Sequence, residues 1–438
     1  MSFLSKAYRR PLPDLVKTYF AGGDEFVDIW TTHRLENYQS DALRCRLVHA
    51  YQSNRFYREK FDAVGARPTA MEFPRDMAQI PLTTKDEIRG KPWLLLSVPR
   101  HAISQIQVST GTTGGEEIYI SHTWEDLHVN YISPAMRRLI PVGTSDVVVD
   151  ALPYEMSSAG LACHRTFQRG YGALVVPAGK GGYYSTPERT LKAAKDLGAT
   201  ILITAPSNAI SLAEAAAGEG CDLSSIPLRF VWLTGEGCSP ALRARIERLW
   251  GKPAYFYYGS LEAGPIGIEC AAQSGLHVAG GHVYLEIIGP KTGERLPPGE
   301  TGEIVITELT RMASPLIRYR TGDTGLIETA KCSCGLELPK LILRGRIGDQ
   351  IRIGKKVYGP YQLEQYLMEI PEAGNWYQLL PSGDQLEILL EPAHGIKIEA
   401  KLAESIASRF ESSTGIKTKI TLVNRIPRAG GKAIRVVR

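Results

Sequence analysis

A run of hydroxyl-bearing residues and glycines stands directly after an expected strand. Its members are Ser109, Thr110, Gly111, Thr112, Thr113 and Gly114. Glycines let successive backbone N–H groups turn toward an anion, and the hydroxyls add further donors without bulk. The run is not a Walker A loop, because no Lys-Ser/Thr pair follows its second glycine at the required spacing. The segment is a candidate phosphate cradle, with an ordinary linker as the alternative.

Cysteine and histidine form a second group that could hold a metal. Six residues separate Cys270 from His277, and Cys332 and Cys334 follow later in the chain. Thiolates with one imidazole suit a closed tetrahedral Zn²⁺ site that stabilises the fold. The spacing is not the familiar C-x2-C, so three buried thiols and a hydrogen-bonded core histidine are the alternative. His282 is a competing ligand.

Three downstream segments give the sequence a family resemblance. YGSLE (258–262), RYRTGD (318–323) and PRAGGK (427–432) occur in this order behind the hydroxyl-rich loop. With these motifs the chain resembles the adenylate-forming superfamily of acyl-CoA synthetases, peptide-synthetase adenylation domains and luciferases. The segments IPLTTK (80–85), SPLIRYRTGD (314–323) and CSCG (332–335) look like phenylacetate-CoA ligases in particular. The resemblance covers nearly the whole chain.

The resemblance implies a site for ATP and Mg²⁺, with coenzyme A as a further co-substrate. Glu262 would then supply a hard oxygen ligand to Mg²⁺, and Lys432 would be the catalytic lysine. Asp323 would accept the ribose hydroxyls, and Tyr258 would lie against the adenine. The other nucleotide-binding candidates are Gly235, Glu236, Gly259, Ser260 and Arg346. Without the resemblance, Glu262 and Asp323 are plain turn carboxylates and Tyr258 is a core tyrosine.

Two positions depart from the family pattern. Gly115 and Glu116 stand where relatives usually have Lys-Pro, which weakens the end of the phosphate cradle. Gly348 stands at the first of two usually acidic positions after Arg346, where relatives hinge. Glycine tolerates large changes in backbone angles, so a hinge is still expected at this point.

The resemblance also indicates where the acid binds. The expected pocket residues are Tyr154, Met156, Ser157, Ala205 and Pro206. Aryl-acid ligases of this family usually have aromatic and glycine-rich residues where this chain has YEMSSAG (154–160). The identity of the acid therefore stays open.

The surrounding elements predict an α/β plus α+β fold. Residues 34–64 have the apolar spacing of a helix, within an entry segment 1–100. From about 104 to 260, β-rich runs alternate with helical stretches, which favours a parallel sheet covered by helices. Closely spaced strands from about 280 to 345 predict an antiparallel β subdomain, and the rest predicts a small α+β unit. We expect a large domain, 1–345, and a small mobile C-terminal domain, 346–438, that carries Lys432.

Composition excludes several classes of protein. The 438 residues are 43% hydrophobic and 22% charged, which is typical of a folded chain with more than one core. A net charge of +5, with both signs interspersed, argues against nucleic acid as a partner. The sequence has no long apolar run or signal peptide, so we expect no membrane association and a cytoplasmic location. Seven cysteines in a long chain fit a reducing compartment.

The main hypothesis is an ATP- and Mg²⁺-dependent ligase that converts a small aryl or short acyl acid to its acyl-AMP and releases pyrophosphate. We expect the acyl group then to pass to a thiol, that of coenzyme A. The first alternative is a stand-alone adenylating enzyme of secondary metabolism that acylates a carrier protein or an amine. The second is a nucleotide-binding protein without catalysis. A homodimer is also compatible with the sequence.

Overall fold

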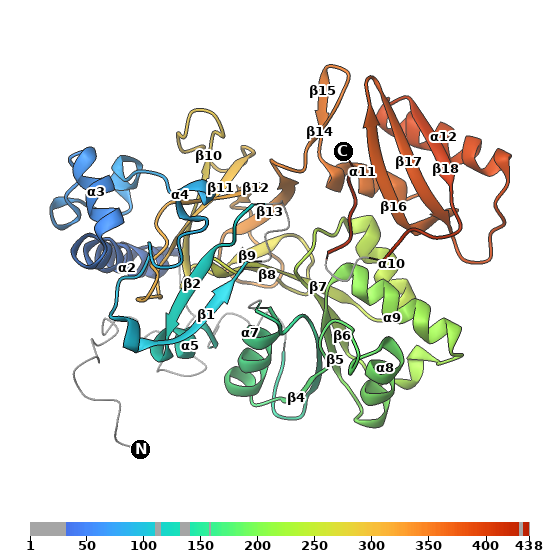
Figure 1. Cartoon of the computed structure of the whole chain (residues 1–438), viewed down its shortest axis with the longest axis horizontal. Coiled ribbons are helices and arrows are strands. Elements are labelled where there is room, and N and C mark those ends of the chain that lie inside the picture. Colours follow the sequence, from blue (N-terminus) through green and yellow to red (C-terminus); the bar gives the residue numbers. More distant parts are fainter. Residues whose placement is uncertain (1–31, 110–114, 132–140, 157–158, 429–431, 438) are drawn as a thin grey trace.

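The computed structural model describes residues 32–109, 115–131, 141–156, 159–428 and 432–437. Its central feature is an 11-stranded sheet of order β10-β11-β12-β13-β9-β8-β7-β6-β5-β3-β4 (Figure 1). The alternating β-rich and helical runs predicted this mixed fold class, and the structure confirms it.

One half of the sheet is parallel. Its strands are β3 (Val147–Ala151), β4 (Leu174–Pro177), β5 (Ile201–Thr204), β6 (Phe230–Leu233) and β7 (Ala254–Ser260). Strands β5 and β6 are buried along their whole length, as expected for apolar runs covered on both faces. The helices of this half are α7 (Ala159–Arg165), η6 (Thr166–Gly170), α8 (Pro187–Asp196), α9 (Pro206–Gly218), η7 (Leu223–Ser225) and α10 (Pro240–Trp250).

The other half is antiparallel and joins the first through the pairing of β7 with β8. Its strands are β8 (Gly264–Glu269), β9 (Leu276–Val278), β10 (Val283–Ile288), β11 (Gly302–Glu308), β12 (Tyr319–Glu328) and β13 (Lys340–Arg346). The antiparallel part was expected from residue 280, but β8 and β9 already belong to it. It also continues the main sheet instead of forming a separate layer, because β7 pairs with β6 on one side and with β8 on the other.

The entry segment holds two helices where one helical stretch was expected. Helix α2 (Thr32–Ser53) ends before Asn54, whose side chain accepts a hydrogen bond from Tyr57 N and begins α3 (Arg55–Ala63). The Asn54 amide also donates to the carbonyls of Leu94 and Leu96, which fixes the break. The smaller elements that follow are η3 (Pro68–Ala70), η4 (Arg75–Gln79), α4 (Lys85–Ile88), η5 (Arg100–Ala102), the hairpin β1 (Ile103–Val108) and β2 (Tyr119–Thr123), and α5 (Trp124–Tyr131).

The C-terminal unit has its own small sheets. Its elements are β14 (Ile351–Ile353), β15 (Lys356–Tyr358), α11 (Pro360–Met368), β16 (Ala373–Ser382), β17 (Gln385–Pro392), α12 (Ala400–Thr414) and β18 (Thr418–Leu422). Strand β16 pairs antiparallel with β17, which pairs parallel with β18. The sequence did not predict β16, whose Gly374, Asn375 and Pro381 are poor strand formers.

The C-terminal unit contacts α9 and α10 of the large part (Figure 1). Glu364 and Gln365 of α11 accept hydrogen bonds from the backbone of Ser239 and Ala241, 2.8 and 2.9 Å away, at the start of α10. The buried Arg245 donates to the carbonyls of Met368 and Ile370. These contacts satisfy helix-end groups that would otherwise lack partners, so they fix one definite arrangement of the two parts.

No helix within the described residues combines the length and the apolar character that a membrane span requires.

Candidate active site

Glu262 follows β7 in a tight turn. The Ser260 hydroxyl accepts a hydrogen bond from Ala263 N at 3.0 Å. A Cβ atom on Gly259 would lie 2.7 Å from the carbonyl oxygen of Gly264, so only glycine fits there. The Tyr319 hydroxyl donates to Glu262 Oε1 at 3.2 Å, and burial followed by the Glu262 charge raises the pKa of Tyr319. Glu262 is half-buried, so its carboxylate is held in place yet reachable.

Asp323 connects two other predicted residues. The Tyr258 hydroxyl donates to Asp323 Oδ2 at 2.6 Å, and Arg346 Nε donates to Asp323 Oδ1 at 2.9 Å. Asp323 and Arg346 are partners in the β12–β13 pairing, so the sheet register itself brings them together. Burial and the Asp323 charge raise the pKa of the Tyr258 phenol, which therefore stays a donor. The three side chains form one cluster.

Lys432 lies at the same place, although it is distant in sequence. Burial lowers the pKa of its ammonium and the Arg346 charge lowers it further, while Glu236, Asp323 and Glu262 act in the opposite direction. Much of the residue is still exposed, so its desolvation is partial. A cation thus stands among the carboxylates that the sequence assigned to nucleotide and metal.

Glu236, one of the nucleotide-binding candidates, follows β6. Gly235, at φ +84°, turns the chain after β6. The Glu236 carboxylate is turned inward and accepts hydrogen bonds from Lys180 Nζ at 3.1 Å and from Ser207 N at 3.1 Å. It also accepts one from Ala433 N at 3.3 Å. Its side chain therefore contacts protein groups on three segments.

The hydroxyl-rich loop is described only at its edges. Ser109 exchanges hydrogen bonds with Ile118 through its backbone N–H and its hydroxyl, which closes the base of the loop between β1 and β2. Thr110, Gly111, Thr112, Thr113 and Gly114 lie outside the described residues. A Cβ on Gly115 would lie 3.1 Å from the guanidinium of Arg89. Arg89, which sequence reasoning missed, brings a cation to the end of the loop.

The expected acid-pocket residues follow neighbouring strands. Strands β3 and β5 are parallel partners, so Tyr154 and the buried Ala205 and Pro206 come after adjacent carboxyl ends. Met156 is 71% exposed and has φ +47°. Its carbonyl accepts from Val108 N at 3.1 Å, which brings it beside the base of the hydroxyl-rich loop. Ser157 lies outside the described residues.

Tyr154 belongs to a polar chain that the sequence did not reveal. Its hydroxyl lies 2.9 Å from Asp150 Oδ2 and 3.1 Å from His164 Nδ1. Asp150 is fully buried at the end of β3. Burial raises the pKa of the Asp150 carboxyl to about 8, despite hydrogen bonds from Tyr154 and Leu152 that favour the charged form.

We expect Asp150→Asn to change the pH dependence of stability. The folded protein holds a proton on Asp150 up to about pH 8, whereas the unfolded chain releases it near pH ~4. Unfolding therefore releases a proton between these values, and the free energy of unfolding falls as pH rises, by at most ~1.4 kcal/mol per pH unit. Asparagine does not titrate. The melting temperature of Asp150→Asn relative to wild type should rise between about pH 5 and about pH 8, and a constant difference in calorimetry would contradict this.

The cysteine group comes together directly after β8, on β9 and in the segment before β13. The ligand atoms of Cys270, His277, Cys332 and Cys334 all lie within 4.8 Å of one another. Cys270 Sγ is 3.5 Å from Cys332 Sγ, and Cys334 Sγ is 3.3 Å from His277 Nε2. His277 Nδ1 faces the Leu338 carbonyl at 3.4 Å, which leaves Nε2 toward the thiols. His282 is not part of this group.

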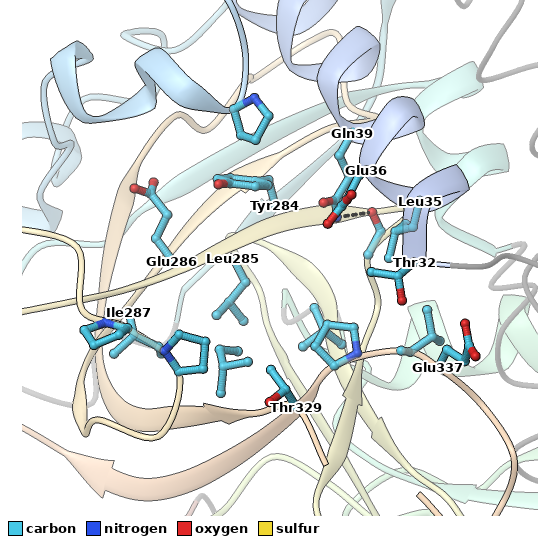
Figure 2. A pocket seen from close by; sticks show the side chains of 18 of the residues that line it. Thr32, Leu35, Glu36, Gln39, Tyr284, Leu285, Glu286, Ile287, Thr329 and Glu337 are labelled. Carbon is cyan, nitrogen blue, oxygen red and sulfur yellow. Dashed lines mark hydrogen bonds between the residues drawn. The ribbon is translucent and has the colours of Figure 1, made fainter. Parts of the chain in front are cut away.

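A cavity of about 460 Å³ lies elsewhere, between α2 and β10. Figure 2 shows Leu35 and Gln39 of α2 on one side and Tyr284 and Leu285 of β10 across from them. None of the residues predicted for nucleotide, acid or metal lines it. It is therefore separate from the candidate active site.

Comparison with known proteins identifies the class. The AMP-binding enzyme family matches residues 67–313, and the C-terminal domain of AMP-binding enzymes matches residues 354–438. The chain belongs to this family. It is an adenylate-forming acid–CoA ligase, and the resemblance seen in its motifs is confirmed.

Curated relatives cover nearly the whole chain. The phenylacetate-coenzyme A ligase of Thermus thermophilus is 30% identical over 92% of this chain and 96% of its own length. That of Escherichia coli is 30% identical over 94% of this chain and 96% of its own length. A crystal structure of 2-hydroxyisobutyryl-CoA ligase in the postadenylation state, with 2-HIB-AMP, has a TM-score of 0.86 at 21% identity, covering 94% of this chain and 90% of that chain. The same ligase in the thioesterification state has a TM-score of 0.68 at 22% identity, covering 94% and 91%.

Proposed function

We propose that this ligase activates a small aryl or short acyl acid with ATP and Mg²⁺ and transfers the acyl group from acyl-AMP to coenzyme A. The observation that carries this proposal is that the charges of Asp323 and Glu262 both act on the Lys432 ammonium. These residues come from three segments far apart in sequence. A cation beside carboxylates at the carboxyl end of β7 suits the charge that develops on the acid and the α-phosphate.

The geometry supports a role for each of these residues. Asp323, held by Arg346 and Tyr258, would accept two ribose hydroxyls with the remaining lone pairs of its carboxylate. Glu262 is the carboxylate that would hold Mg²⁺, which neutralises phosphate charge when bound. The loop after Ser109 would surround the phosphates with N–H and hydroxyl donors. Arg89 adds positive charge where Gly115 brings none. Lys432 would contact the acid carboxylate and the α-phosphate.

We propose that Gly348 marks the hinge between a large domain, 1–345, and a mobile domain, 346–438. The higher TM-score with a postadenylation structure than with a thioesterification structure supports an arrangement suited to the first step. The second step then needs the C-terminal domain to rotate, which removes Lys432 and admits the thiol.

The acid pocket would lie at the ends of β3 and β5, near Tyr154, Met156 and Ala205. The named relatives act on phenylacetate. The Asp150–Tyr154–His164 chain adds polar groups beside this pocket, so the substrate panel should include hydroxylated as well as plain aryl and short acyl acids.

The acceptor is tested by product analysis. Protein incubated with ATP, Mg²⁺ and each acid is offered coenzyme A, a holo-carrier protein or an amine, and products are identified by mass spectrometry. Acyl-CoA as the main product supports the proposal. An acylated carrier protein or amide, with no acyl-CoA, would favour the alternative of a secondary-metabolism enzyme. A homodimer and a cytoplasmic location stay predictions, and light scattering in solution checks the first.

We also propose that Cys270, His277, Cys332 and Cys334 hold a structural zinc ion. Three thiols and an imidazole nitrogen within 4.8 Å of one another match the ligand set of a closed tetrahedral site. The ion would join β8 and β9 to the segment before β13 and so stabilise the antiparallel half of the sheet.

We expect one zinc per chain to co-purify and Cys332→Ser to lower the melting temperature, because a structural ion contributes its binding energy to folding. Metal analysis by mass spectrometry and calorimetry measure the two effects. Cys221→Ser, at a half-buried cysteine outside the group, is the matched control. Zinc-free protein from a preparation without chelators would contradict the proposal.

A further inference from the structure

The Glu236 carboxylate sits where three segments meet beside Lys432. Its Oε1 accepts from Lys180 Nζ at 3.1 Å, from the Ser207 hydroxyl at 2.8 Å and from Ala433 N at 3.3 Å. Its Oε2 accepts from Ser207 N at 3.1 Å. The side chains of Lys180 and Glu236 are only 12% and 9% exposed. Water therefore screens this ion pair weakly.

Glu236 is stabilised as an anion. Ser207 is the second residue of α9, so its N–H is one of the helix-end donors that a carboxylate satisfies well. Burial alone would raise the pKa of Glu236, but Lys180 and the Ser207 hydrogen bonds outweigh it and hold the pKa below its usual value. The negative charge of Glu236 therefore lies next to the backbone that follows Lys432.

That charge acts on Lys432 in two opposite ways. The bond from Ala433 N orients the backbone directly after Lys432, which helps to aim the ammonium. Yet Glu236 is also the strongest attractive charge that Lys432 feels. Among the described residues, Lys432 forms no ion pair, whereas Lys180 does pair with Glu236. Lys180 thus pairs with the Glu236 carboxylate, which could otherwise form an ion pair with Lys432.

We propose that Lys180 neutralises Glu236. Glu236 can then orient the backbone of Lys432 and Ala433 without forming an ion pair with the Lys432 ammonium. This inference rests on the proposed function, in which Lys432 contacts the acid and the α-phosphate. Lys180 and Glu236 are then positioning residues for the first half-reaction only. Lys180 stands in the glycine-rich segment after β4, where Gly179 N donates to the Asp150 carbonyl at 3.0 Å.

A double-mutant cycle with timed half-reactions tests the proposal. Lys180→Met should slow adenylate formation roughly tenfold, because Glu236 is released to pair with Lys432. Glu236→Gln should slow adenylate formation by a similar factor, because Ala433 N loses its charged hydrogen-bond acceptor. The double variant should be no slower than Glu236→Gln alone, since no carboxylate is left to capture Lys432. Transfer from chemically prepared acyl-AMP should change less than about twofold in all three.

Two further variants separate positioning from folding. Lys180→Arg keeps the charge and should restore adenylate formation if Lys180→Met loses it. Lys192→Met with Asp196→Asn removes an exposed ion pair from α8 and should leave both steps unchanged. Melting temperatures of all variants are measured alongside.

Full additivity in the double variant, or equal slowing of both half-reactions, would overturn this inference and leave the proposed function standing. Wild-type protein that forms no acyl-AMP from any acid would instead remove the proposed function, and this inference with it.

Discussion

Replacing Lys432 with alanine is expected to abolish most adenylate formation while leaving transfer from acyl-AMP largely intact. Negative charge concentrates on the acid oxygen and the α-phosphate as pyrophosphate leaves, so a positioned ammonium contributes most in that transition state. Loss of one such group typically costs ~3 kcal/mol, or a factor of roughly 10² to 10³ in rate. The negative charges of Glu236, Asp323 and Glu262 already act on the Lys432 ammonium.

The two half-reactions are timed separately for Lys432→Ala and wild type. Lys397→Ala, at an exposed lysine of the same C-terminal unit, is the matched control and should behave as wild type. If Lys432→Ala slows both half-reactions by the same factor, Lys432 only supports the fold and the alternating arrangement is wrong.

Gly348→Pro is expected to have the opposite effect, with adenylate formation retained and transfer slowed about tenfold or more. Proline fixes φ near −65° and so resists the rotation that transfer requires. The chain up to Ile347 is tied to the large part, because Arg346 pairs with Asp323 and Ile347 N donates to the Gly322 carbonyl at 2.8 Å. We therefore expect rotation to begin at Gly348, before β14 starts at Ile351.

Gly348→Ala is the control for this experiment. A Cβ at position 348 meets no atom within 4 Å, so alanine fits the arrangement seen here without a clash. It should retain both half-reactions nearly at wild-type rates. Normal transfer in Gly348→Pro would place the hinge elsewhere.

Local patterns in the sequence predicted much of the fold. Helices α8 and α9 and strands β3 to β7 follow from apolar periodicity and turn residues, which act over a few residues. Strand β16 was missed because Gly374, Asn375 and Pro381 are poor strand formers. They outweigh the strand signal of its buried Trp376 and Tyr377. The break between α2 and α3 was missed because Asn54 is fixed by Leu94 and Leu96, which are distant in sequence.

The candidate site was only partly predictable for the same reason. Asp323, Arg346 and Tyr258 stand in recognisable motifs. The β12–β13 pairing brings Asp323 to Arg346, and the Tyr258 hydroxyl donates to Asp323. Lys180, Arg89 and Asp150 belong to no motif. Lys180 and Arg89 are brought to Glu236 and Gly115 by tertiary contacts that local spacing does not encode. The burial of Asp150 likewise arises only in the folded chain.

The most direct test of the account is the exchange of labelled pyrophosphate into ATP by wild-type protein with Mg²⁺ and a panel of acids. Exchange reports the reversible formation of acyl-AMP and needs no acyl acceptor. We predict exchange that depends strictly on the added acid and is strongest for a subset of aryl or short acyl acids. Protein that binds ATP yet shows no exchange with any acid would contradict the assignment of Lys432, Asp323 and Glu262 to an adenylate-forming site.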